Sequence, residues 1–74
     1  MELIENICID KKIKGGKPVI KGTRVPVDLI LGKLAGGMTY EAVMKEYDIT
    51  KKDILSVLEY ASVYIANDEI RVAV

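Results

Sequence analysis

The fold is decided by residues 39–66, TYEAVMKEYDITKKDILSVLEYASVYIA. Apolar side chains recur in this stretch at i, i+3, i+4 and i+7, the spacing of one face of an α-helix. This spacing predicts a helix over residues 40–47 that begins after Thr39, and a longer helix over residues 51–67 that begins after Thr50. Asp53 forms a capping-box-like pair with Thr50. Two short, separately capped helices with a tight connection are typical of a helix-turn-helix unit.

A third helix and a short hairpin are expected before this unit. The helix should span residues 26–36, beginning at Pro26 and ending at the paired glycines. Its core face comprises Val27, Ile30, Leu31 and Leu34. Alternating β-branched residues predict a β-hairpin with a basic loop over residues 7–25, with Pro18 at the start or edge of its second strand.

These elements predict a single domain over residues 1–74. The expected fold class is mainly α with a small β element: a three-helix, homeodomain-like helix-turn-helix bundle preceded by a short β-hairpin. Residues 70–74 alternate again and indicate a terminal strand or a tail. A swapped-hairpin fold, in which two chains interleave β-hairpins, is the alternative, and the three successive helical stripes argue against it.

Composition argues against an enzyme. The 74 residues include no histidine and one cysteine, so the chain can form neither a Ser–His or Cys–His nucleophile pair nor a Cys/His zinc site. Cys8 is expected to pack as a small apolar residue. We expect no catalytic residue, metal ligand or cofactor. The single cysteine and the absence of a long apolar run favour a cytoplasmic protein without a membrane span.

Charge is unevenly distributed although eleven basic and eleven acidic residues cancel. Residues 1–33 carry seven bases and four acids, and residues 34–74 carry four bases and seven acids. The basic part predicts a polyanion or an acidic protein surface as partner, unless it is only a solvated hairpin tip. In a helix-turn-helix, the start of the second helix enters the major groove of duplex DNA. The candidate DNA-binding residues are Lys51, Lys52 and Ser56 on that helix, with Lys17, Lys21 and Arg24 before the first helix.

The helix over residues 51–67 is apolar over a wider arc than one small core needs. Its expected core stripe is Ile54, Leu58, Ala61 and Ile65, and the opposite, solvent-facing side carries Lys52, Ser56, Glu59, Val63 and Asn67. Its flank predicts a protein interface, with a homodimer as the expected assembly. The interface residues are Val57, Tyr60, Val63 and Tyr64, joined by Ile70 and Val72. Alternatively, the N-terminal hairpin or the terminal strand covers this flank.

Residues 15–27, GGKPVIKGTRVPV, resemble the signature of a small prokaryotic family, domain of unknown function 433. The resemblance extends over residues 7–66 and implies a compact helix-turn-helix-like bundle with a small β element. Members of the family are commonly described as VapB-type antitoxins that lie beside a PIN-like ribonuclease toxin. The resemblance therefore implies a PIN-like toxin as partner, and it carries over no catalytic residue. Within the signature, Arg24 is expected either to pair with Asp28 or to present its guanidinium to a phosphate or a partner carboxylate.

Two functions are consistent with these features. The first is a non-enzymatic, antitoxin-like module that binds a toxin and operator DNA. The second is a pure protein–protein interaction module without DNA binding, which the neutral overall charge and the acids of the last helix favour.

Overall fold

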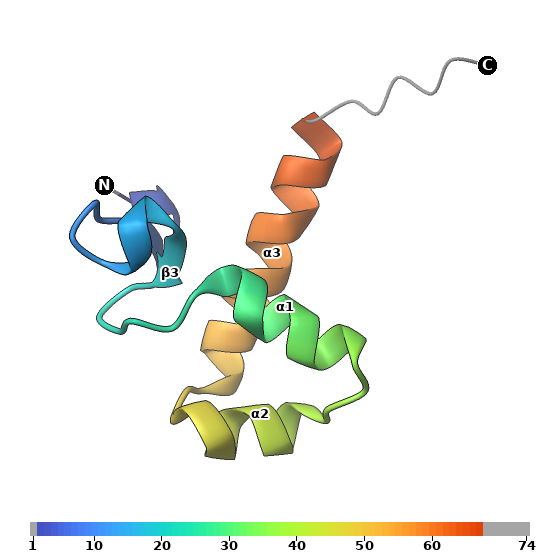
Figure 1. Ribbon diagram of the computed structural model, residues 1–74. Helices are drawn as coiled ribbons and strands as arrows, with labels where there is room; N and C mark the ends of the chain where they lie inside the picture. Colours follow the sequence, from blue (N-terminus) through green and yellow to red (C-terminus); the bar gives the residue numbers. More distant parts are fainter. Residues whose placement is uncertain (1, 68–74) are drawn as a thin grey trace.

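The computed structural model describes residues 2–67, in which three helices follow a small antiparallel sheet (Figure 1). The strands are β1 (Glu2–Ile4), β2 (Ile7–Ile9) and β3 (Pro18–Ile20), and a 3-10 turn, η1 (Lys14–Gly16), lies between β2 and β3. The helices are α1 (Val27–Ala35), α2 (Tyr40–Tyr47) and α3 (Lys51–Asn67). The predicted mainly α fold class is confirmed. The predicted strand or tail at residues 70–74 lies outside the described residues.

The sheet has one more strand than the predicted hairpin. β2 lies in the middle and pairs with β1 on one side and with β3 on the other. Pro18 begins β3 opposite Ile9, as expected for a residue that has no N–H to donate. On its outer side, β3 forms an isolated bridge from Val19 to Pro26, so the chain that leads into α1 covers part of this edge.

A hydroxyl group shapes the connection between β3 and α1. Thr23 Oγ1 donates to the carbonyl of Ile20 at 2.7 Å and accepts the N–H of Val25 at 3.0 Å. Gly22, at φ +80°, supplies the left-handed residue that this turn requires. Pro26 is extended and caps α1 rather than beginning it, so the helix is one residue shorter at each end than predicted.

Side-chain caps begin α2 and α3 where they were predicted. Thr39 Oγ1 accepts the N–H of Ala42 at 3.1 Å. Thr50 and Asp53 form a reciprocal capping box: the Asp53 N–H donates to Thr50 Oγ1 at 3.1 Å, and the Thr50 N–H donates to Asp53 Oδ2 at 2.9 Å. Asp48, in the left-handed conformation at φ 54°, ends α2 and turns the chain toward α3.

The core lies where the three helices meet the sheet. It combines side chains from every helix with two from the sheet: Ile7, Ile20, Val27, Ile30, Val43, Ile49, Ile54 and Val57. The prediction that Ile65 belongs to the core stripe is wrong, because α3 extends past the other elements and leaves that side chain 67% exposed (Figure 1). Among the described residues, every helix is too short or too polar to cross a lipid bilayer.

Candidate functional site

The first turn of α3 presents two lysines to solvent. Lys51 and Lys52 follow the capping box directly, and both are exposed. Lys52 Nζ lies 3.7 Å from a carboxylate oxygen of Glu5 in the turn between β1 and β2, and both side chains are about three-quarters exposed (73% and 74%). Such a pair contributes little to stability and leaves the ammonium accessible to a ligand.

An asparagine ties the sheet to this part of α3. Asn6, at φ 71° between β1 and β2, donates from Nδ2 to Asp53 Oδ1 at 2.7 Å and to Ser56 Oγ at 3.5 Å. Partial burial of the Asp53 carboxyl opposes its ionisation, but hydrogen bonds from Thr50 and Asn6 outweigh that effect, so the pKa of Asp53 lies below its ordinary value. The carboxylate therefore has two structural roles: it caps α3 and anchors the sheet.

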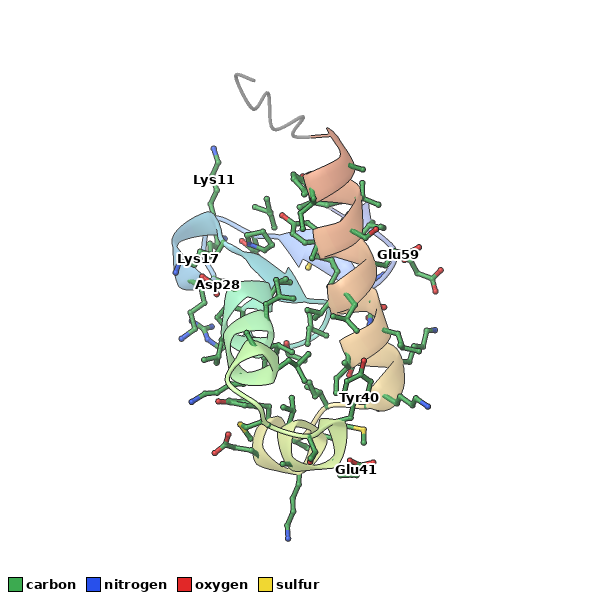
Figure 2. The ribbon with its side chains drawn as sticks, turned by 90° about the vertical axis from the view of Figure 1, so that its right-hand side faces the viewer. Lys11, Lys17, Asp28, Tyr40, Glu41 and Glu59 are labelled. Atoms are coloured by element: carbon green, nitrogen blue, oxygen red, sulfur yellow. The ribbon has the colours of Figure 1, made fainter. Side chains whose placement is uncertain are left out.

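Ser56 is not available to DNA. It was predicted to lie on the solvent-facing side of α3, but it is only 8% exposed and lies beneath the Asn6 amide. The cause is the sheet, whose turn between β1 and β2 lies over the side of α3 that was predicted to face solvent. The exposed side is consequently rotated toward Lys51, Leu55 and Ser62, and Glu59 points away from the domain (Figure 2). Leu55, 50% exposed one turn after Lys51, was not among the predicted site residues.

The other predicted basic residues separate into two groups. The N–H of Lys21 donates to the carbonyl of Asn6 at 2.8 Å, which brings Lys21 to the side of the sheet that contacts the first turns of α3. Lys17 lies before β3 and pairs with Asp28 of α1 at 3.2 Å (Figure 2). One of the two expectations for Arg24 was a pair with Asp28. Asp28 pairs with Lys17 instead, and Arg24 is exposed.

A shallow groove lies between η1 and α1. Its basic residues are Lys14, Lys17 and Lys33, and its remaining walls are formed by Pro26, Asp28, Leu29 and Gly32. Leu29 is 37% exposed there, and Gly32 adds no side chain. Three ammonium groups beside an apolar floor suit a ligand with both carboxylates and an apolar side chain. We call this feature the η1–α1 groove.

The predicted interface residues divide between core and surface. Val57 is fully buried in the core, so its placement on an interface is wrong. Tyr60 is half-buried against the core, and its ring lies 4.4 Å from that of Tyr64 between centroids. Burial and the neighbouring Tyr64 hydroxyl raise the pKa of the Tyr60 phenol. Val63 and Tyr64 are exposed, whereas Ile70 and Val72 lie outside the described residues.

The side chains that commonly bind metal ions are dispersed through residues 2–67. No three His, Cys, Asp or Glu side chains in this part of the chain lie close enough to hold a metal ion. Cys8 is half-buried in the central strand. Three surfaces of the described residues could contact another molecule: the first turn of α3, the η1–α1 groove and the end of α3.

Comparison with known proteins places the chain in a family. The model of a family described as protein of unknown function (DUF433) matches residues 7–61. The chain belongs to the DUF433 family. The matched DUF433 region contains β2, β3, α1 and α2 with most of α3, and it ends before the exposed residues at the end of that helix.

A curated relative is an uncharacterized protein of Archaeoglobus fulgidus, 60% identical over 25 residues. That match covers 34% of this chain and 69% of the relative. The search of solved structures finds no significant match. Neither the description of the DUF433 family nor that of this relative names an activity.

Proposed function

We propose that this DUF433 protein is a non-enzymatic, antitoxin-like binding module that binds duplex DNA and a partner protein. The α2–α3 unit carries the DNA part of the proposal. Its two helices are joined by residues 48–50, and α1 packs against both, which is the arrangement of a helix-turn-helix. In this arrangement the start of the second helix approaches the major groove.

The residues at the start of α3 suit contact with DNA. Lys51 and Lys52 are exposed at its first turn, and Lys21 reaches the same side of the molecule through Asn6. Their ammonium groups would neutralise phosphates, which positions a protein on DNA without reading sequence. Leu55 offers an apolar contact for a thymine methyl group. We call Lys51, Lys52 and Leu55 the α3 start.

Fluorescence anisotropy with a labelled duplex from the protein's own promoter tests the DNA part. Three phosphate contacts per chain predict a log–log slope of affinity against salt of about −3 for one chain. Lys51→Glu/Lys52→Glu should abolish binding at low salt. The matched control, Lys14→Glu/Lys33→Glu, makes the same change in net charge in the η1–α1 groove and should retain binding. Absence of binding by the unaltered protein, or equal loss in both variants, would exclude DNA recognition by α3.

The η1–α1 groove is the surface that we assign to the partner protein. Its three lysines and apolar floor complement an acidic segment that carries an apolar anchor. The apolar floor of Pro26 and Leu29 offers an anchoring contact to a protein side chain and none to a sugar-phosphate chain. The family resemblance supplies the identity of the partner in this proposal: a PIN-like ribonuclease toxin encoded by a neighbouring gene.

Co-purification with the product of the adjacent gene tests the partner proposal. The unaltered chain and Lys51→Glu/Lys52→Glu should both retain that product. Lys14→Glu/Lys33→Glu should lose it, with circular dichroism confirming that the helices remain. If no adjacent gene product is retained, or if the groove variant retains it fully, the assignment of the groove is wrong.

A second candidate function is a protein interaction module without DNA binding. It is favoured by the carboxylate of Glu5, which lies beside Lys52 and lowers the positive potential at the first turn of α3. Glu59, on the same exposed side of α3, acts in the same direction (Figure 2). Retention of the neighbouring gene product by a protein that ignores the promoter duplex at low salt would select this function.

A further inference from the structure

Gly32 lies inside α1, where only proline is less suitable than glycine. Glycine in a helix interior destabilises a protein relative to alanine, because it loses more backbone freedom on folding and packs no side chain. Gly32 is the sixth of the nine residues of α1. Its φ is not positive, so alanine would adopt the same backbone conformation without strain. The local structure of α1 therefore does not require a glycine at this position.

Tertiary packing in the described part of the chain does not require this glycine either. Apart from the backbone of α1 itself, a Cβ atom at Gly32 would meet no heavy atom of these residues within 4 Å. The residue is exposed. The fold therefore gains nothing from the missing side chain, whereas a molecule that contacts α1 from outside would gain direct access to its backbone.

The open space beside Gly32 belongs to the η1–α1 groove. On the α1 side, Gly32 lies one turn after Leu29, whose side chain is 37% exposed. Lys33 follows Gly32 directly, and Lys14 belongs to η1 on the other side of the groove. Among residues 2–67, neither of these two lysines forms an ion pair. An accessible helix backbone and two uncompensated positive charges thus occur in the same groove.

We propose that Gly32 determines partner specificity in the η1–α1 groove, because a large apolar side chain of the partner packs directly on the α1 backbone at this residue. The inference rests on the proposed function, which assigns the groove to a partner protein, and it adds where the apolar anchor lies. The anchor covers Gly32 and Leu29, and carboxylates beside it reach Lys14 and Lys33. A side chain at residue 32 would occupy the position of that anchor.

Charge favours an acidic protein segment over other occupants of the groove. A second copy of this chain that bound through the same groove would bring its own Lys14 and Lys33 against these lysines, and the two copies would repel each other. A purely apolar segment would remove water from the ammonium groups without supplying a partner for them. An acidic segment with one apolar anchor satisfies both the charges and the open space at Gly32.

Thermal unfolding of Gly32→Ala tests the premise without any partner. The variant should raise Tm by about 3–8 °C, because alanine replaces glycine within an exposed part of a helix. A Tm that is unchanged or lowered would show that the fold itself favours glycine at this position, and would overturn the proposal.

Calorimetric titration with the purified product of the adjacent gene tests the contact. Gly32→Ala should weaken binding about 10-fold and Gly32→Leu at least about 100-fold, since an added group in a well-packed contact is strongly unfavourable. Ala42→Leu adds similar bulk to an exposed position of α2 and should bind as the unaltered chain does. Gly32→Ala thus gains stability while it loses affinity, a combination that a general loss of structure cannot produce.

The possible failures are distinguishable. If the unaltered chain does not bind the adjacent gene product, the proposed partner and this inference are both wrong. If it binds and both Gly32 variants bind equally well, only the role of Gly32 is overturned. If both variants weaken binding of the promoter duplex and leave the partner complex intact, the groove takes nucleic acid and the proposal is wrong.

Discussion

The hydrogen bonds of Asp53 join the start of α3 to the N-terminal sheet, and removing them should have a measurable cost. Asp53→Ala removes the acceptor for the Thr50 N–H at 2.9 Å and for the Asn6 amide at 2.7 Å. Loss of a helix cap costs about 1 kcal/mol. A hydrogen bond to a charged group contributes about 1.5–3 kcal/mol, and partial exposure of Asp53 favours the lower value. We expect a loss of about 2.5 kcal/mol, which for a domain of this size lowers Tm by about 10–20 °C.

Thermal unfolding followed by circular dichroism at 222 nm measures this loss, and a double-mutant cycle separates its two parts. Asn6→Gly removes the amide but tolerates the positive φ of 71° at that position. The cycle with Asp53→Ala should give a coupling of about 1 kcal/mol. Asp28→Ala is the control, because that carboxylate makes only an exposed ion pair and should change stability by less than about 0.5 kcal/mol. A destabilisation by Asp53→Ala as small as that of the control, or zero coupling, would refute the account of this contact.

Three further changes probe other parts of the fold. Because the pKa of Asp53 is lowered in the folded state, its ionisation stabilises the protein above about pH 4, and this contribution is lost as the pH falls through the lowered pKa. Urea unfolding measured between pH 5 and pH 2 should therefore show a weaker pH dependence of stability in Asp53→Asn than in the unaltered protein. An unchanged pH dependence would contradict the assignment. Ile54→Ala removes a fully buried side chain and should cost about 2–5 kcal/mol in urea unfolding, whereas the same change at exposed Leu55 should cost far less. Gly22→Ala should lower Tm because φ is +80° at that residue, although the space around its Cα is open; an unchanged Tm would show that the turn relaxes.

The helices were predictable because their determinants are local. Thr39 and Thr50 cap the helices that follow them, and the apolar period within α2 and α3 identifies their buried sides. β1 was not predicted, since a three-residue strand gives almost no periodic pattern and depends on pairing with β2. The predicted first and last residues of every helix were accurate to one residue.

Errors at the candidate site follow from the missing strand. With only helices in view, the side of α3 opposite Ile54 is expected to face solvent, which placed Ser56 on the surface. The turn between β1 and β2 covers Ser56, and the exposed side moves to Lys51 and Leu55. Val57, expected on the flank of the helix, belongs to the core beside Ile54. Periodicity within one helix cannot reveal such a rotation, because it depends on a contact between residues 47 positions apart, Asn6 and Asp53.

The glycine- and proline-rich signature is largely explained by the backbone. Gly22 and Thr23 build the turn before α1, and Pro26 caps that helix while it bridges to β3. The exposed side chains of Lys21 and Arg24 are not required by these turns. Arg24 is therefore a part of the signature that the surface displays.

Backbone amide NMR of the full chain during titration with its promoter duplex tests most directly the central claim, that the start of α3 binds DNA. We predict that added duplex shifts the amide signals of Lys51, Lys52 and Leu55 and leaves those of Lys14 and Lys33 in place. Shifts confined to the η1–α1 groove on addition of DNA, or no shift at the first turn of α3, would contradict the account.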